Sequence, residues 1–354
     1  MGVLVSGAAV ADSASAALAG VLAAQDSRGC WLDFPTVGEG SDEWITGYVG
    51  AAVAHAAPRE AARAWQALAT RKRWSGGWGY MPSYPADADS TICALRLAQS
   101  LPGGGGVRAW RARLFLARHQ HASGGIATYH WPRRMMWHTR LRETFEGWCS
   151  PHVCVSANAA LLDRYKGRAR LFEFLRAAQR PDGSWCAYWW YDEAEYATAL
   201  AAEALSVSPR SAHRAAVRRA IAWVVETASS DGVVRTPAAP DGSAFATALR
   251  LRVLALDDTA TSAELALDML AWLLRTQRGD GLWASSGWLR FPPTEIVDPA
   301  TIPIWHIGEM IRAGVMVDER GLFTTATVLT ALRAITSCGF IETRNVRFQA
   351  ATRS

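Results

Sequence analysis

Two kinds of predicted helix alternate along the chain. One kind is apolar on a single face, as at Leu265, Met269 and Leu273, whose spacing places them on one helical stripe. The other kind, seen at residues 197–202 and 246–249, is rich in Ala, Thr and Leu and is apolar on most sides. A helix that is apolar all round is buried on both faces. The alternation therefore predicts an inner ring of helices enclosed by an outer ring.

A repeated signature separates the first helix of each pair from the second. Clear copies of Gln-x-x-x-Gly-x-Trp begin at Gln25, Gln179 and Gln277, and degenerate copies begin at Lys72, Gln120 and Ala228. The final positions of the six copies lie 47 to 49 residues apart, except for one interval of 59 residues. Six units at this period predict an all-α fold in which six helix pairs close into an (α/α)6 barrel, with the inner helices lining a cavity.

The repeat runs through nearly the whole chain, which predicts a single barrel domain over residues 1–354. Two connections are unusually long, at about 127–151 and 285–320, and a short helix is expected near 304–311. A short tail follows from 340 to 354. Loops of this length in a compact domain are often lids or binding loops, and extra packing at the rim is the alternative.

Tryptophan is the outlier of the composition, with 17 copies against 10 Phe and 8 Tyr. This excess requires either a repeated structural role or an aromatic-lined cavity. The formal net charge of +5 comes more from Arg than from Lys and is spread along the chain. Because no basic block with interleaved aromatic residues is present, nucleic-acid binding is not predicted. A mild attraction to anionic lipid or to a phosphorylated substrate is compatible with this charge.

The cysteines and the N-terminus favour a cytoplasmic protein, with contact at the membrane periphery left open. Six cysteines show no Cys-x-x-Cys spacing and are predicted to be reduced thiols. The apolar stretch from Val3 to Ala24 is interrupted by Asp12 and has no basic segment before it, so it predicts a first helix rather than a signal peptide. No uncharged apolar run is long enough to span a membrane.

Candidate chemistry lies in the stretch from Gly76 to Thr91. A Gly/Trp turn and two prolines lead into Asp87 and Asp89, which stand at the start of an apolar helix over residues 92–98. Charged side chains seldom enter apolar surroundings without a partner or a function. Asp89 is therefore the candidate proton donor. The alternative is structural, with Asp87 capping the helix and Asp89 in its first turn.

The Gln-x-x-x-Gly-x-Trp repeats resemble the QW motifs of the squalene–hopene cyclase and class II terpene cyclase superfamily. The stretch from Asp87 to Thr91 is similar to the Asp-x-Asp-Asp-Thr acid motif of that superfamily, with Ser90 in place of its last aspartate. The resemblance implies that Asp89 protonates an alkene or epoxide of a linear isoprenoid or prenylated substrate and so starts cationic ring closure. It also places Asn158 where hopene cyclases carry a histidine that partners the acid, with His152 as a weaker candidate.

The resemblance implies no cofactor, although Mg²⁺ would be compatible with a diphosphate substrate. Burial and the second carboxyl of Asp87 are expected to raise the pKa of Asp89, whereas the helix N-terminus favours the anion. Cationic intermediates would be held by aromatic faces. Candidate substrate-binding residues near the starts of the inner helices or in the long loops are Trp44, Tyr84, Trp148, His152, Tyr188, Trp189, Trp190, Tyr191 and Trp305.

Other readings of these residues stay open. Arg133 and Arg134 could hold a diphosphate or simply face solvent. No metal site is predicted, because the Asp, Cys and His spacing of the zinc-dependent prenyltransferases that share this barrel is absent. The cavity could be closed by the insertions or by a second subunit, which leaves a homodimer open. Rival functions are a non-catalytic barrel that binds an isoprenoid or a peptide, and a cyclase-like enzyme that acts on a non-terpene substrate.

Overall fold

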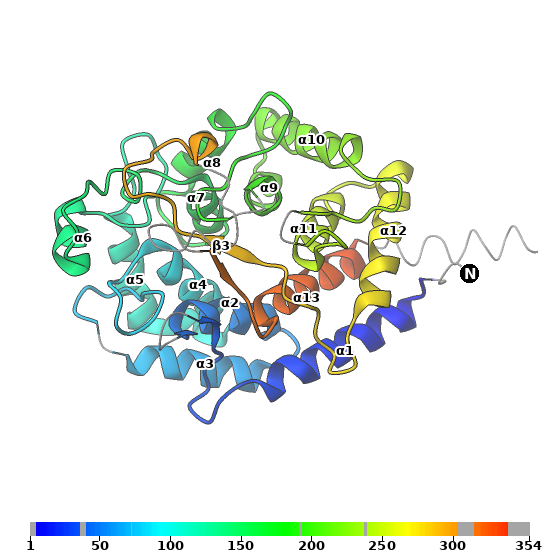
Figure 1. The fold of residues 1–354 in the computed structure, drawn as a ribbon, viewed down its shortest axis with the longest axis horizontal. Coiled ribbons are helices and arrows are strands. Elements are labelled where there is room, and N and C mark those ends of the chain that lie inside the picture. Colours follow the sequence, from blue (N-terminus) through cyan, green and yellow to red (C-terminus); the bar gives the residue numbers. More distant parts are fainter. Residues whose placement is uncertain are drawn as a thin grey trace, which may run out of the picture.

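The computed structural model describes residues 5–35, 40–71, 73–190, 193–236, 239–302 and 315–338. Within them, two nested rings of helices form the predicted (α/α)6 barrel (Figure 1). The outer helices are α1 (Gly7–Ala23), α3 (Pro58–Thr70), α5 (Gly106–Ala117), α8 (Arg168–Ala177), α10 (Ser211–Glu226) and α12 (Ala260–Thr276). The inner helices are α2 (Glu43–Val53), α4 (Ala88–Gln99), α7 (Val153–Ala160), α9 (Glu193–Ser206), α11 (Ala244–Leu254) and α13 (Leu322–Ser337).

The two rings differ in the way their sequences predict. On the outer helix α3, the buried residues are Ala61, Ala64 and Leu68, which share one face. On the inner helix α11, every residue from Ala244 to Leu254 is buried. An inner helix is covered on one side by the outer ring and on the other by the middle of the barrel. The sequence-based assignment of the two rings is therefore confirmed.

The Gln and Trp side chains of the signature form hydrogen bonds that link neighbouring helices. Gln25 Nε2 donates to the carbonyl of Gly29 within its own turn and to the carbonyl of Glu60 on the next outer helix, each at 3.0 Å. Trp31 Nε1 donates at 2.7 Å to the carbonyl of Val21 in the last turn of α1, where carbonyls lack the i+4 amide of a continuing helix. Equivalent indole bonds join Trp78, Trp185 and Trp283 to the carbonyls of Leu68, Leu175 and Leu273.

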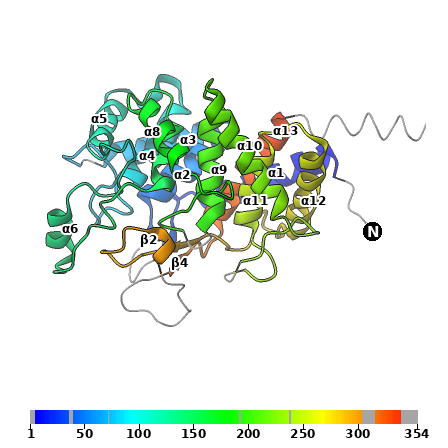
Figure 2. The same cartoon turned by 90° about the horizontal axis from the view of Figure 1, so that it is seen from above.

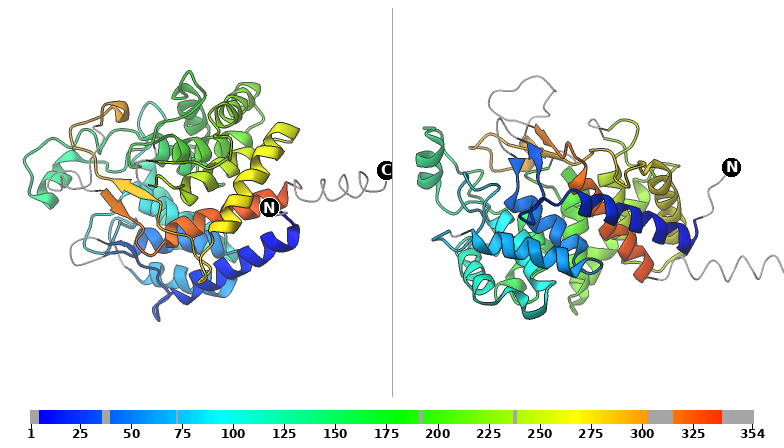
Figure 3. Two further views of the ribbon diagram at one scale, coloured as in Figure 1. Left: turned by 45° about the vertical axis from the view of Figure 1, so that its right-hand side comes forward. Right: turned by 90° about the horizontal axis from the view of Figure 1, so that it is seen from below.

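The same type of hydrogen bond joins the last repeat to the first and so closes the ring. Gln277 Nε2 donates to the carbonyl of Ser13 on α1 at 2.9 Å. On the inner ring, the hydroxyls of Tyr48 on α2 and Thr327 on α13 lie 2.8 Å apart. Figure 3 shows α1, α12 and α13 meeting at this seam. The glycine of the signature, Gly281, has a φ of 83° and its Cβ position lies 2.2 Å from the carbonyl oxygen of Ala16, so a side chain cannot fit there.

The long connections lie at the end of the barrel where the inner helices begin (Figure 2). The first contains α6 (Pro132–Thr139). The second contains β3 (Trp288–Arg290), which pairs antiparallel with β4 (Val315–Val317). A second small sheet joins β1 (Asp33–Pro35) to β2 (Gly40–Ser41), and the 3₁₀ turns are η1 (Pro102–Gly105) and η2 (Pro299–Thr301). The helix expected near 304–311 and the tail 340–354 lie outside the described residues.

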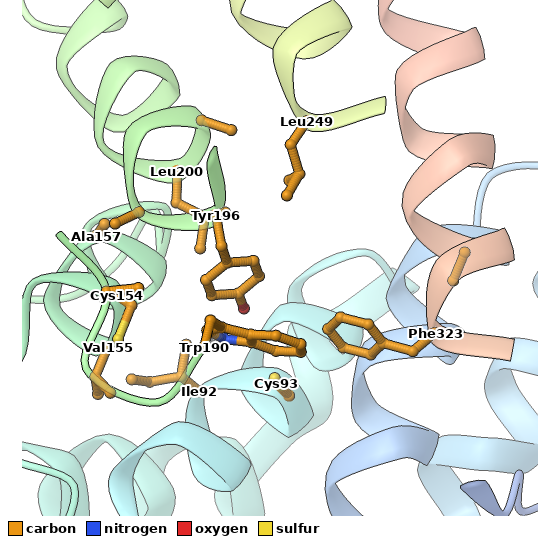
Figure 4. Packing of buried hydrophobic residues seen from close by; sticks show 14 of the residues in the cluster. Ile92, Cys93, Cys154, Val155, Ala157, Trp190, Tyr196, Leu200, Leu249 and Phe323 are labelled. Atoms are coloured by element: carbon orange, nitrogen blue, oxygen red, sulfur yellow. The ribbon is translucent and has the colours of Figure 1, made fainter. Parts of the chain in front are cut away.

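Aromatic side chains fill the middle of the barrel, where the sequence predicted a cavity lined by the inner helices. Trp190 stacks on Phe323 of α13 with ring centroids 4.9 Å apart, and lies 4.6 Å from the ring of Tyr196 on α9 (Figure 4). Trp44 of α2 and Phe245 of α11 pack against the same indole. The cavity expected inside the inner ring therefore does not extend through this part of the barrel, because protein interiors pack closely and large aromatic rings take up this space.

No helix within the described ranges combines the length and the apolar character that crossing a membrane requires.

Candidate active site

The site is built on the N-terminus of α4. Asp87 is the N-cap of this helix, and its Oδ1 accepts a hydrogen bond from the backbone N–H of Ser90 at 2.7 Å. The Ser90 hydroxyl donates to the other carboxyl oxygen of Asp87, also at 2.7 Å. The structural reading of Asp87 as a cap is thus confirmed. Both carboxyl oxygens of Asp87 are occupied by its own helix, which leaves Asp89 as the freer of the two acids.

Asp89 lies in the first turn of α4 and faces a pocket of about 50 Å³. Asp87 is buried, whereas Asp89 remains partly accessible from the pocket although protein surrounds it. The pocket is lined by Trp44, Tyr80, Tyr84, Asp87, Asp89, Ser90, Thr128, Tyr129, Trp189, Leu289 and Phe291. Apart from the two acids, Ser90 and Thr128, all of these side chains are aromatic or aliphatic, so the acid faces an apolar, ring-lined space.

Burial raises the pKa of both carboxyls. For Asp89 the pKa rises from 3.8 to about 6, with burial opposed by a hydrogen bond from Asn158 and by the more distant Arg96. The indole N–H of Trp44 also favours the Asp89 anion, although it has no partner in hydrogen-bond geometry among the described residues. For Asp87 burial raises the pKa to about 7, and the charge of Asp89 adds to the rise. A carboxyl that keeps its proton near neutral pH can act as a general acid.

Asn158, on the neighbouring inner helix α7, forms a hydrogen bond to Asp89. Its Nδ2 donates to Asp89 Oδ1 at 3.4 Å, while its Oδ1 accepts from Arg96 Nη1 at 2.9 Å. Arg96 can only donate, so it fixes the amide oxygen on its own side and turns the NH₂ toward Asp89. Sequence reasoning named Asn158 and missed Arg96. The available signal was position, since Arg96 lies two helical turns after Asp89 on the same face of α4.

The structure brings three of the predicted aromatic residues to the acid, namely Trp44, Tyr84 and Trp189. It adds aromatic residues that sequence reasoning missed, among them Tyr80, Tyr129 and Phe291. Tyr80 belongs to the same Gly/Trp turn as Asp87, so its place two residues after Trp78 was the available signal. Phe291 comes from the distant connection after β3, and no local pattern links it to the acid.

Other predicted residues lie close to the pocket without lining it. The Trp148 indole donates to the carbonyl of Pro292 at 2.9 Å, and its ring packs on the ring of Trp189. Tyr188 stacks on the imidazole of His152 behind Trp189, and Trp190 fills the middle of the barrel.

Four further candidates are outside the acid pocket or outside the described ranges. Arg133 and Arg134 are exposed on α6 and are not among the residues that line the acid pocket. Tyr191 and Trp305 lie outside the described residues. In the part of the chain that the structure describes, no three His, Cys, Asp or Glu side chains are placed to hold a metal ion.

Comparison with known proteins agrees with this geometry. Residues 153–289 match the family model of the squalene-hopene cyclase C-terminal domain. No curated protein matches the chain in sequence. The type II terpene cyclase MstE from Scytonema, solved in complex with geranylgeranyl dihydroxybenzoate as substrate, is 35% identical, with a TM-score of 0.87. The alignment covers 94% of this chain and 98% of that one.

Two other solved structures show how far the likeness extends. A protein from Actinoplanes is 36% identical, with a TM-score of 0.86 over 92% of this chain and 99% of that chain. An α-1,6-mannanase from Salegentibacter shares the barrel, with a TM-score of 0.56 over 93% of this chain and 99% of that one, at only 12% identity. The mannanase shows that the barrel alone does not determine the chemistry. The identity to MstE over almost its full length does decide the family: this chain belongs to the type II, or class II, terpene cyclases.

Proposed function

We propose that this cyclase closes rings in a linear isoprenoid chain carried by a prenylated small molecule, with Asp89 as the general acid. The observation that carries the proposal is the position of Asp89, a carboxyl with a raised pKa that faces an apolar pocket lined by aromatic rings. Such a group can deliver a proton to an alkene carbon, and the ring faces then stabilise the positive charge that moves along the chain.

The acid is tuned by its neighbours in opposite directions. Burial raises the pKa of Asp89 and so favours its protonated form before the reaction, and the hydrogen bond from Asn158 stabilises the carboxylate that remains afterwards. The start of α4 adds to that stabilisation, because a helix N-terminus favours negative charge. Asp87 and Asn158 are accordingly proposed as the residues that adjust Asp89, while Asp87 also holds the first turn in place through Ser90.

The proposed substrate class is supported by the pocket and by the relative that binds a prenylated ring. MstE, at 35% identity, was captured with geranylgeranyl dihydroxybenzoate. The pocket of this chain has a volume of about 50 Å³, which is smaller than the volume of a polyprenyl chain. Binding of such a chain therefore has to displace side chains that line the pocket. Tyr84 and Phe291 are only half-buried and are the least confined of the aromatic residues that line it.

A role in membrane attachment is proposed for α6 and the residues beside it. Trp131, Trp137 and Leu141 are exposed by 57%, 82% and 46%, and Arg133 and Arg134 lie among them. Exposed tryptophans next to arginines are typical of segments that lie at a lipid surface. Binding to vesicles of anionic lipid, lost in a Trp131→Ser, Trp137→Ser double variant, would support this role.

Asp89→Asn tests the catalytic proposal. The amide keeps the size and polarity of the carboxyl and cannot deliver its proton, so product formation should fall by about 10³-fold or more while affinity for the prenylated substrate stays within a few-fold. Glu203→Gln, the same exchange at a carboxyl of α9 that does not line the acid pocket, is the matched control. Turnover that survives in Asp89→Asn would show that another group starts the reaction.

A further inference from the structure

Thr128 lies on the wall of the acid pocket and has a buried histidine as a hydrogen-bond partner. Its Oγ1 is 2.9 Å from Nδ1 of His152, a histidine that is 2% exposed. The other ring nitrogen, Nε2, is 2.9 Å from the backbone carbonyl of Gly147. A carbonyl can only accept, so Nε2 of the neutral ring carries the proton and Nδ1 presents its lone pair to Thr128.

Among the residues that the structure describes, the hydrogen bonds around the Thr128 Oγ1 leave one acceptor site unused. The hydroxyl proton is donated to His152 Nδ1, and one lone pair accepts the indole N–H of Trp189 at 2.7 Å. A hydroxyl has two lone pairs, so Oγ1 of this pocket-lining residue has a second one with which to accept a proton. Tyr188 stacks on the imidazole with ring centroids 3.9 Å apart and holds the ring in this orientation.

We propose that Thr128, backed by His152, accepts the proton that ends the cyclisation. This inference rests on the proposed function, because it concerns the last cation of that reaction. The C–H bond next to the cationic carbon breaks, and its electron pair becomes the second bond of an alkene. The proton joins Thr128 Oγ1 while the hydroxyl's own proton moves to His152 Nδ1. The products are a neutral alkene, a neutral threonine and an imidazolium.

Charge balance in the pocket is preserved by this step. Asp89 is a carboxylate when the cascade ends, because its proton is by then on a substrate carbon. The imidazolium at His152 then replaces the substrate cation as the positive partner of that carboxylate. Burial lowers the pKa of His152 to about 3, below that of Asp89 at about 6, so the proton is given up readily and the starting state of Asp89 is favoured.

The Tyr80 hydroxyl in the same pocket shows why Thr128 is suited to this role. Tyr80 donates to the backbone carbonyl of Phe34 at 2.8 Å, and a carbonyl oxygen has little capacity to keep a proton. Thr128 instead donates to an imidazole nitrogen, which can. Thr128 is thus the proposed catalytic residue, since it faces the substrate, and His152 is the positioning residue that acts through it.

Thr128→Val tests the inference, with Thr128→Ser as the matched control. Valine has nearly the same shape without the oxygen, and the Trp189 indole lies 3.2 Å from His152 Nδ1, so both groups keep a partner in this variant. We expect Thr128→Val to consume substrate within about three-fold of the wild-type rate, and the main alkene to fall by about ten-fold or more as a share of products. Water-captured alcohols or other alkene isomers should replace it. Thr128→Ser should restore the wild-type product.

Each other result overturns the inference. An unchanged product profile in Thr128→Val would assign the final proton to another acceptor, such as the Asp89 carboxylate. Loss of substrate consumption in a variant that melts like the wild type would make Thr128 part of initiation or binding. A wild-type product that has gained water, or has closed on a heteroatom, would also contradict it. If Thr128→Val does not fold, Thr128→Ala is judged by the same outcomes. Wild-type protein that leaves the prenylated substrate unconsumed would instead refute the proposed function.

Discussion

Asp89 and Glu203 are two carboxyls of the inner ring with opposite surroundings. Asp89, at the start of α4, has the amide of Asn158 at 3.4 Å as its hydrogen-bond donor. Glu203, near the other end of α9, receives two hydrogen bonds from the buried Arg252, at 2.6 and 2.7 Å. Burial raises the pKa of Asp89 against the hydrogen bond from Asn158, whereas the Glu203 carboxyl has the guanidinium of Arg252 beside it as a counter-charge. Within the described residues, Asp89 therefore combines burial with the lack of an ion pair, which suits it to act as an acid.

The two ends of the barrel also differ in whether aromatic rings or charged side chains line their cavities. The acid pocket is lined mainly by rings, and the Asp89 and Asp87 carboxyls have no ion pair there within the described residues. At the opposite end a cavity of about 160 Å³ is lined by Arg96, Arg252 and Arg333 together with polar side chains. Arg96 lines this second cavity and also donates a hydrogen bond to Asn158. It is therefore in contact with both the polar cavity and the hydrogen-bond partner of Asp89.

Exchanging each carboxyl for its amide should separate the two roles most sharply. Asp89→Asn should lose about 10³-fold or more in product formation, as the acid is removed. Glu203→Gln should keep activity within a few-fold and lose roughly 3 kcal/mol in the free energy of unfolding, because Arg252 stays buried without its counter-charge. Rates of product formation and urea unfolding measure the two effects. Equal activity losses in both variants would contradict the assignment of Asp89 as the acid and Glu203 as a structural carboxyl.

The pH dependence of stability should differ between Asp89→Asn and the wild type. The folded chain raises the pKa of Asp89 from 3.8 to about 6, so it binds that proton more tightly than the unfolded chain does. The resulting stability is present below about pH 4 and is lost as the pH rises through about 6. Between pH 4 and pH 8 the wild type should therefore lose roughly 3 kcal/mol more than Asp89→Asn. Parallel curves of unfolding free energy against pH would contradict a raised pKa.

Removing the amide partner should weaken the acid without abolishing it. The Asn158 hydrogen bond lowers the pKa of Asp89 against the effect of burial. In Asn158→Ala that pKa should rise, so the alkaline limb of the rate profile should move to higher pH while the maximal rate falls by about ten-fold or more. Arg96→Gln should shift the limb in the same direction by less, because Arg96 acts through Asn158. A limb that stays in place would exclude Asn158 as a tuning residue.

The smallest effect is expected for the exposed arginines of α6. Arg133→Ala and Arg134→Ala should change kcat/KM for a prenylated substrate without a diphosphate by no more than about two-fold, because neither side chain lines the acid pocket. Pyrophosphate should not compete with that substrate. A large rise in KM in either variant, or competition by pyrophosphate, would restore these residues as a diphosphate site and reopen the question of Mg²⁺.

The architecture and the position of the acid could both be predicted from local patterns. The period of the signature gave the six units, and each Gln and Trp makes hydrogen bonds that fasten neighbouring helices. Asp87 and Asp89 could be placed because one helix start determines both positions. Asn158 was found by resemblance, and its contact with Asp89 crosses from α7 to α4.

The parts that were missed depend on contacts between distant segments. Phe291 and Leu289 reach the acid pocket from a connection about two hundred residues later in the chain. The Thr128–His152 pair joins the two ends of the first long connection, and no local sequence pattern links the two residues. Trp190 was expected at the mouth of a cavity and instead fills the middle of the barrel, where its ring packs against aromatic side chains from four inner helices. Hydrophobicity alone does not distinguish a residue that lines a cavity from one that is packed in the core.

The most direct test of the central claim is cyclisation in D₂O with a prenylated substrate whose chain ends in an alkene. If the exchangeable carboxyl proton of Asp89 starts the reaction, each product molecule carries one carbon-bound deuterium at the end of the chain that was protonated, and Asp89→Asn yields no labelled product. Cyclised product without carbon-bound deuterium would mean that the reaction begins by another route, and the account of Asp89 given above would be wrong.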